Sequence, residues 1–254
     1  MKVGVFWRKF RNVELQKRIS QDNIYDDAYD EALQHMTAIK EAGFDATLIQ
    51  WKKDPKETLK ELISQKIDIV FNASSLKEVA FLEAFGIPFV GSGIDLVATS
   101  KAARKKLVAF HSLPTPKFFV VSDSRQIPEH SLKYPLFVKP VRGRGSAGIS
   151  EENVVNHPEE LPKVIDKITQ KIGQAALVEE FIKGREITVG LIGNDNPRVL
   201  PILEIQYNSA ITNTYEHKML DNEIIHCPAD FTNEEENRIK DTAKRIYKVL
   251  NAKD

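Results

Sequence analysis

The stretch of sequence that decides the fold is LFVKPVRGRGSAGIS, residues 136–150. Its apolar start predicts a β-strand that ends in a lysine and a proline, Lys139 and Pro140. Three glycines follow between positions 143 and 148, and Ile149-Ser150 predicts a returning strand. In a hairpin loop rich in glycine, no side chains cover the backbone N–H groups. Lys139 adds a positive charge at the base of this loop. The stretch therefore favours a loop that closes over phosphate oxygens.

The same glycines, from Gly143 to Gly148, match the dinucleotide-binding pattern G-x-G-x-x-G. That pattern binds a dinucleotide when its glycines directly follow a strand and open a helix. Here Lys139-Pro140 separates the strand from the glycines, and Asn156-His157-Pro158 delays the next helix. We therefore interpret the loop as a phosphate-binding hairpin. For this loop alone, a solvated hairpin with a lysine reaching into water explains the residues equally well.

A second stretch, ALVEEFIKGREIT at residues 176–188, favours the phosphate interpretation. It predicts a strand that runs into a hinge. The hinge backbone can pair with the edge of an adenine, its apolar side chains can pack near the ring, and the next glutamate can accept hydrogen bonds from both ribose hydroxyls. The residues concerned are Glu179, Glu180, Phe181 and Ile182 in the hinge and Glu186 beyond it. The alternative is two ordinary strands with acidic residues on the solvent-exposed face. The two stretches together are nevertheless a far more specific signal of nucleotide binding than either alone.

The first hundred residues alternate between strand and helix signals, which predicts a parallel sheet with helices outside it. Gly43 is expected to end the first helix, and Asp54-Pro55 to begin the second. The predicted strands are 3–6, 46–49, 67–71 and 87–90. Three helices are predicted between them: one over 25–39, one that begins at residue 54, and one that ends at residue 85.

Beyond residue 93 the pattern changes, and strands outnumber helices. A helix over 95–110 leads to the rigid connector Leu113-Pro114-Thr115-Pro116. The predicted strands are 118–121, 136–139, 176–181, 186–192 and 199–205, with helices over 158–172 and at the end of the chain. We predict three parts: an N-terminal α/β domain over residues 1–98, a central part with the phosphate loop over 99–178, and a partial C-terminal part over 179–254.

The composition excludes several classes of protein. The 254 residues include 36 Lys plus Arg and 36 Asp plus Glu, so no basic surplus indicates a nucleic-acid partner. No apolar run approaches the ~20 residues of a membrane span, so we expect a soluble, cytoplasmic protein without a membrane partner. The single cysteine, Cys227, is interpreted as a buried small hydrophobe. The six histidines show no metal-site spacing.

At these residues the chain resembles the ATP-grasp superfamily and, within it, the D-alanine–D-alanine ligases. The resemblance covers about Ile67 to the C-terminus and includes GIPFVGSG at 86–93, YEHK at 215–218 and CPA at 227–229. It implies that Lys218 is a catalytic residue that reaches the terminal phosphate of ATP. The nucleotide-binding residues that it implies are Lys101, Lys139, Arg144, Gly145, Ser146, Ala147, Glu179, Glu180, Phe181, Ile182 and Glu186.

The resemblance also implies a fold and a reaction. The fold is a parallel α/β domain followed by α+β ATP-grasp subdomains, the last one incomplete. The reaction is an ADP-forming ligation in which ATP converts a carboxylate into an acyl phosphate and an amine then forms an amide or dipeptide. The partners implied are ATP and small amino-acid or peptide substrates, with a homodimer as the assembly.

The chain departs from these ligases on the amino-acid side. Glu14 is a poor match to their first acidic residue, the segment 72–78 replaces their H-G-x-x-G-E-D-G, and Met219 stands where they have tyrosine. Their Mg²⁺ ligands lie beyond the last helix, so we expect no metal ligand in this chain and no activity from the 254 residues alone. The alternative is an ATP-binding protein without ligase activity, either a pseudoenzyme or a subunit completed by another chain.

Overall fold

The computed structural model describes residues 1–8, 27–72, 76–142, 150–207 and 223–254. The chain forms two compact units, one made of residues 1–98 with 251–254 and the other of residues 99–250. The predicted combination of a parallel α/β part with α+β parts is confirmed. No helix in the described ranges is long and apolar enough to cross a membrane.

The first unit is built on a parallel sheet whose strand order is β2-β1-β3-β4. Its strands are β1 (Lys2–Trp7), β2 (Asp45–Gln50), β3 (Ile69–Asn72) and β4 (Phe89–Val90). Its helices are α2 (Asp27–Glu41), α3 (Pro55–Ser64), α4 (Leu76–Ala84) and α5 (Ile94–Val97).

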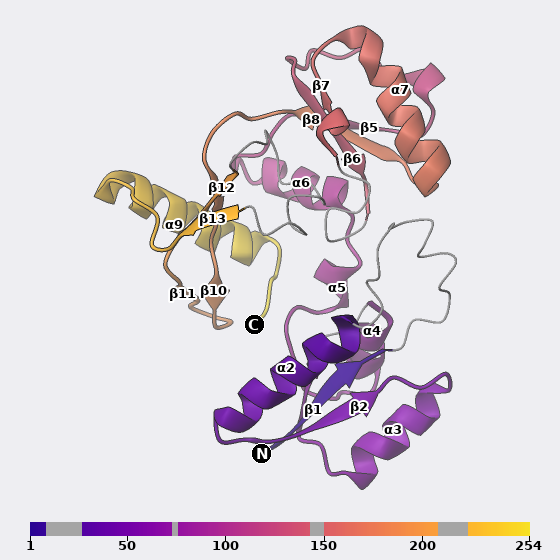
Figure 1. The fold of residues 1–254 in the computed structure, drawn as a ribbon, viewed down its shortest axis with the longest axis vertical. Coiled ribbons are helices and arrows are strands. Elements are labelled where there is room, and N and C mark those ends of the chain that lie inside the picture. Colours follow the sequence, from indigo (N-terminus) through magenta and orange to yellow (C-terminus); the bar gives the residue numbers. More distant parts are fainter. Residues whose placement is uncertain (9–26, 73–75, 143–149, 208–222) are drawn as a thin grey trace. The chain divides into compact units, whose positions relative to one another are not determined.

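The order of these strands explains where the helices lie. The crossover from β1 to β2 moves one way along the sheet, and the crossover from β2 to β3 moves back past β1. Because such crossovers are right-handed, α2 and α3 lie on opposite faces of the sheet, as Figure 1 shows. The α3 and α4 side gathers one apolar core, made of Phe6, Ile49, Leu62, Val70, Phe81 and Leu82.

Two predicted helix ends of this unit are confirmed. Gly43 has φ +87°, and its N–H bonds back to Lys40 O at 2.9 Å while Phe44 N–H reaches Ile39 O at 3.2 Å. This pair of bonds is the glycine-terminated end typical of α-helices. At the start of α3, the Asp54 carboxylate accepts a hydrogen bond from Lys56 N–H at 3.0 Å.

The second unit contains an antiparallel four-stranded sheet, a three-stranded sheet and a two-stranded ribbon. The four-stranded sheet has the order β5-β8-β6-β7, the three-stranded sheet β13-β12-β9 and the ribbon β10-β11. The strands are β5 (Phe118–Val121), β6 (Leu136–Pro140), β7 (Val154–Val155), β8 (Ala176–Glu180), β9 (Glu186–Thr188), β10 (Leu191–Ile192), β11 (Arg198–Val199), β12 (Leu203–Tyr207) and β13 (Glu223–His226).

Helices of this unit cover sheet faces and flank the strands. They are α6 (Lys101–Phe110), α7 (Leu161–Asp166) with a π-helical continuation over Lys167–Ile172, and α9 (Asn233–Val249), besides short 3₁₀ turns at Ser124–Gln126, Glu151–Asn153 and Pro158–Glu160. One face of the four-stranded sheet packs on α7 (Figure 1). That core consists of Val121, Leu136, Val138, Val155, Leu161, Val164, Ile165, Ile168, Ala176 and Val178.

Several predicted elements differ from the structure. The predicted helix over 95–110 is two helices, because Ser100 caps a new helix by accepting Ala103 N–H at 3.2 Å. The predicted strand over 199–205 is interrupted at Pro201, which has no N–H to offer a sheet. The predicted strand over 186–192 passes from one sheet to another at Val189-Gly190.

Two further expectations were wrong. A returning strand was predicted at Ile149-Ser150; Ile149 lies outside the described residues, Ser150 is not in a strand, and the strand beside β6 begins at Val154 after a 3₁₀ turn. Cys227 is exposed rather than buried. The short strand β13 was not predicted.

Candidate active site

The candidate site begins with a row of side chains across the four-stranded sheet. In the strand register, Glu179 on β8 pairs with Phe118 on β5 and with Phe137 on β6. Directly paired residues project to the same face, and residues two apart along a strand do so as well. Lys139 therefore shares the face of Phe137, opposite the face that packs on α7. This second face carries a carboxylate, an amine and two aromatic rings.

Glu179 is the centre of the site. Its side chain is only 8% exposed, and each carboxylate oxygen has a lysine partner. Lys139 Nζ pairs with Oε1, and Lys105 Nζ lies 2.8 Å from Oε2. A buried carboxylate needs such partners because burial removes its hydration. The two lysine heads lie over aromatic rings, Lys139 at 5.4 Å from the Phe137 centroid and Lys105 at 5.2 Å from that of Phe118.

Lys101 adds a third amine at the start of α6. Its backbone N–H donates to Val141 O at 3.1 Å, and its Nζ donates to Pro140 O at 3.1 Å, beside Lys139. Burial and the nearby Lys139 charge lower the pKa of Lys101, while Glu179 acts in the opposite direction. In the part of the chain that the structure describes, Lys101, Lys105 and Lys139 thus lie around the Glu179 carboxylate. Positive charge at a helix N-terminus is suited to an anion.

The stems of the glycine-rich loop are anchored beside these lysines. At the first stem, Arg142 N–H donates to Gln174 Oε1 at 3.1 Å. At the second stem, Asn153 Oδ1 accepts Ser150 N–H at 2.8 Å, and Asn153 Nδ2 donates to Val138 O at 2.6 Å. Asn153 is fully buried, so it ties the second stem directly to the strand that carries Lys139.

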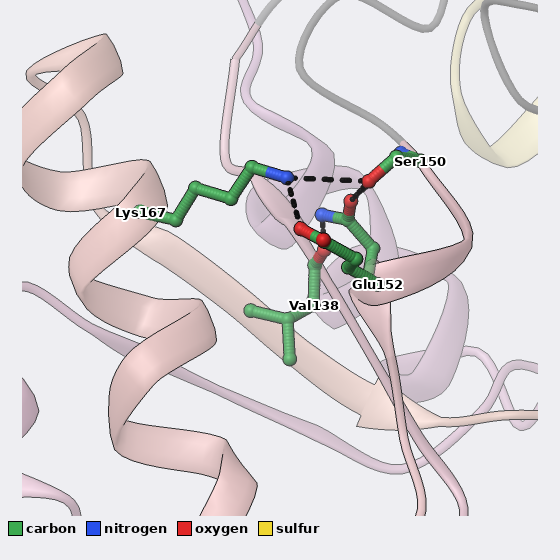
Figure 2. A network of polar contacts seen from close by, with 5 residues as sticks. Val138, Ser150, Glu152 and Lys167 are labelled. Atoms are coloured by element: carbon green, nitrogen blue, oxygen red, sulfur yellow. Dashed lines mark hydrogen bonds and ion pairs between the residues drawn. The ribbon is translucent and has the colours of Figure 1, made fainter.

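Lys167 reinforces the second stem. Figure 2 shows it reaching both Ser150 and Glu152, at 3.3 Å to Ser150 Oγ and 2.8 Å to Glu152 Oε2. This contact lowers the pKa of Glu152. The predicted loop residues Arg144, Gly145, Ser146 and Ala147 lie outside the described residues.

The hinge after β8 is partly committed to the sheet. Glu180 N–H donates to Lys117 O at 3.0 Å and Phe181 N–H to Pro135 O at 2.9 Å. The Glu180 carboxylate accepts Lys133 N–H at 3.0 Å, so it is held away from Glu179. Ile182 follows with a side chain that is 66% exposed. The backbone N–H groups of Glu180 and Phe181 are therefore both used within the second unit.

Glu186 lies on β9, opposite Ile205 of β12, and is exposed. Its neighbour Arg185 holds the buried Glu204 through Nε at 2.7 Å and Nη2 at 2.5 Å. Arg185 Nη1 also donates to Asp230 O at 2.8 Å, and the guanidinium stacks 3.9 Å over the Phe231 ring. The hydrogen bonds from Arg185 lower the pKa of Glu204.

A hollow of about 450 Å³ is lined by Arg185, Glu204, Gln206, His226, Pro228 and Asp230. The predicted catalytic Lys218 belongs to the segment between β12 and β13 and is outside the described residues, as are Glu14 and Met219.

Among the described residues, no group of three or more His, Cys, Asp or Glu side chains is arranged to hold a metal ion.

The structure brings together Lys101, Lys139 and Glu179 among the predicted residues, and it adds Lys105, which sequence reasoning missed. Lys105 lies four residues after Lys101, a spacing that places both on one face of α6. That spacing is the signal that could have found it.

This cluster lies on one face of an antiparallel sheet, in an architecture that agrees with the ATP-grasp ligase fold that the sequence predicts. The family model described as the D-ala D-ala ligase C-terminus matches residues 107–254. The chain belongs to the D-alanine–D-alanine ligase family.

Individual relatives agree with this assignment. The chain is 31% identical over 222 residues to a D-alanine–D-alanine ligase of Natranaerobius thermophilus, covering 80% of this chain and 58% of the relative. It is 32% identical over 231 residues to that of Carboxydothermus hydrogenoformans, covering 84% and 71%. The chain thus spans between about half and three quarters of the length of these relatives.

Solved structures share the fold. The D-alanine–D-alanine ligase of Bacillus anthracis complexed with ATP has a TM-score of 0.72 at 19% identity, with 100% of this chain and 79% of that chain covered.

Proposed function

We propose that this protein is an ATP-dependent carbon–nitrogen ligase that joins two small amino-acid or peptide substrates. ATP converts the carboxylate of one substrate into an acyl phosphate and leaves as ADP, and the amine of the other displaces phosphate to form an amide. The observation that carries the proposal is the group of three lysines around Glu179, with Lys101 at the N-terminus of α6. The likeness to a ligase complexed with ATP supports the choice of nucleotide.

We propose the following roles for the residues of the site. Lys101 and Lys139 bind phosphate oxygens, and Lys139 does so by exchanging Glu179 for the nucleotide. The hinge receives the adenine against the exposed Ile182. In the undescribed segments, Arg144, Gly145, Ser146 and Ala147 close over the phosphates and Lys218 neutralises the transferred phosphoryl group. Glu186 binds the ribose, and Glu180 supports the hinge through Lys133 N–H. These groups position the reactants and neutralise charge, which is the protein's main task in phosphoryl transfer.

The three-part organisation is proposed on the same grounds. Residues 1–98 form the N-terminal α/β domain, residues 99–178 carry the phosphate loop, and residues 179–254 carry the adenine hinge. The cytoplasm is the proposed location, because the reaction consumes ATP. Mg²⁺ as a cofactor and a homodimer as the assembly remain proposals from the family resemblance.

Calorimetry with ATP and the Lys139→Met variant tests the nucleotide site. Methionine keeps the apolar stem over Phe137 but removes the charge, and we expect affinity to fall about tenfold or more. The control is Lys106→Met, the same change at an exposed lysine of helix α6, which should leave affinity unchanged. Equal affinity in wild type and Lys139→Met would contradict the site.

Release of ADP tests the ligase half of the proposal. Wild-type protein is incubated with ATP, Mg²⁺ and pairs of amino acids, and ADP is followed by a coupled assay. Release that depends on an amino-acid pair supports the ligase. Binding of ATP without such release, over the full set of pairs, favours an ATP-binding protein without ligase activity.

A further inference from the structure

Lys105 is a half-buried residue of the site to which neither the family motif nor the proposed roles give a task. Its side chain is 15% exposed, and its Nζ has three partners within unit 2. It lies 2.8 Å from Glu179 Oε2, donates to Thr115 Oγ1 at 2.7 Å and lies over the Phe118 ring. Thr115 belongs to the proline-flanked connector before β5. Lys105 therefore has a fixed position that is set by three different elements.

A phosphate group and the Glu179 carboxylate would compete for the same cation, Lys139. Without nucleotide, Lys139 and Lys105 share the buried carboxylate, one on each oxygen. When Lys139 turns to a phosphate oxygen, Oε1 loses its cation, and a buried carboxylate without a cation is strongly unfavourable. Lys105 lies beside the other oxygen, Oε2, and is held by Thr115, so it can remain paired with Glu179 when Lys139 moves.

We propose that Lys105 is a positioning residue that retains Glu179 and so releases Lys139 to bind the phosphates of the nucleotide. This inference rests on the proposed function. Without Lys105, Lys139 keeps the remaining ion pair with Glu179 among those that the described residues form, and it stays paired with it. The loss of Lys105 should therefore lower the affinity for phosphorylated ligands, which need Lys139, and leave the affinity for adenosine unchanged.

The test compares ATP and adenosine binding by calorimetry in wild type and Lys105→Met. We expect ATP affinity to fall about tenfold while adenosine affinity changes less than about twofold. Lys105→Arg, which can reach the same carboxylate, should restore most of the ATP affinity. Lys106→Met, at the exposed neighbouring position of α6, is the matched control and should bind ATP as wild type does.

A double-mutant cycle separates positioning from simple support of the fold. Glu179→Gln removes the charge that traps Lys139, so adding Lys105→Met to Glu179→Gln should cost much less ATP affinity than Lys105→Met costs alone. If the two losses are equal, or if Lys105→Met binds ATP as tightly as wild type, the inference is overturned. If Lys105→Met does not fold, Thr115→Val, which removes one hydrogen bond to Lys105, must show the same selective loss for ATP in smaller measure, and its absence overturns the inference. Wild-type protein that binds no ATP would contradict the proposed function itself. Wild-type protein that binds ATP, but no more tightly than Lys105→Met does, would contradict only the inference about Lys105.

Discussion

Asn153 supports a stability prediction whose size follows from its contacts. Its amide joins Ser150 N–H and Val138 O, at 2.8 and 2.6 Å, and its side chain is fully buried. Asn153→Ala removes both bonds, together with a longer one from Ser150 Oγ at 3.2 Å, and leaves a buried carbonyl and a half-buried N–H without the partner they had. A net hydrogen bond contributes about 1 kcal/mol, and a buried group left without a partner costs about 1–3 kcal/mol. The variant should therefore destabilise unit 2 by roughly 2–4 kcal/mol.

The assay must report on residues 99–250, and tryptophan fluorescence does not, because both tryptophans, Trp7 and Trp51, lie in the first unit. Hydrogen exchange of peptides from β6 and β8 reports on the right sheet. A loss of 2 kcal/mol speeds the exchange of their slowest amides about 30-fold. Asn156→Ala is the control, because Asn156 is exposed, and it should leave the rates unchanged. Equal rates in the two variants would refute the reasoning.

Three further predictions concern pH and helix capping. Burial and a neighbouring lysine lower the pKa of Lys101, and on the proposed function a bound triphosphate should raise it again. ATP binding should therefore take up a proton at alkaline pH, and affinity should fall as pH rises through the lowered pKa; calorimetry in two buffers of different ionisation enthalpy measures this uptake. Hydrogen bonds from Arg185 lower the pKa of Glu204, so their stabilisation is present above the usual glutamate pKa and is lost as pH falls through the lowered one. Arg185→Met should accelerate hydrogen exchange in β12 at neutral pH, with a difference from wild type that shrinks on acidification; a constant difference would count against the pair. Thr232→Ala removes a capping box with Glu235 at the start of α9 and should cost about 1 kcal/mol, seen as exchange about fivefold faster in the first helical turn, while Thr232→Ser retains it.

The elements set by local sequence could be predicted from the chain. Helix ends at Gly43 and Asp54 follow from φ angles and capping groups within a few residues. The points at which the predicted strands over 186–192 and 199–205 are interrupted were harder to predict, because they depend on pairing with distant strands. Pro201 was a visible exception, since a proline inside a predicted strand argues against a continuous one.

The candidate site shows the same limit. Lys101, Lys139 and Glu179 belong to sequence motifs, and the structure brings them together. Lys105 and Asn153 carry no motif. Lys105 acts across 74 positions of sequence on Glu179, and Asn153 acts on a strand 15 residues earlier. Contacts between elements far apart in sequence make these residues neighbours, α6 with β8 for Lys105 and a 3₁₀ turn with β6 for Asn153, and no local pattern contains the position of the partner.

The register also explains why core and site depend on each other. On β6 and β8, Val138 and Val178 face the apolar core beneath α7, while the next residues, Lys139 and Glu179, face the opposite side of the sheet. A slip of one residue in either strand would exchange these faces and bury a charge against leucine and isoleucine. The fully buried core residues therefore hold Lys139 and Glu179 in place. The bond from Asn153 to Val138 O acts at this point, because it secures the strand one residue before Lys139 and ties the loop that follows to the same register.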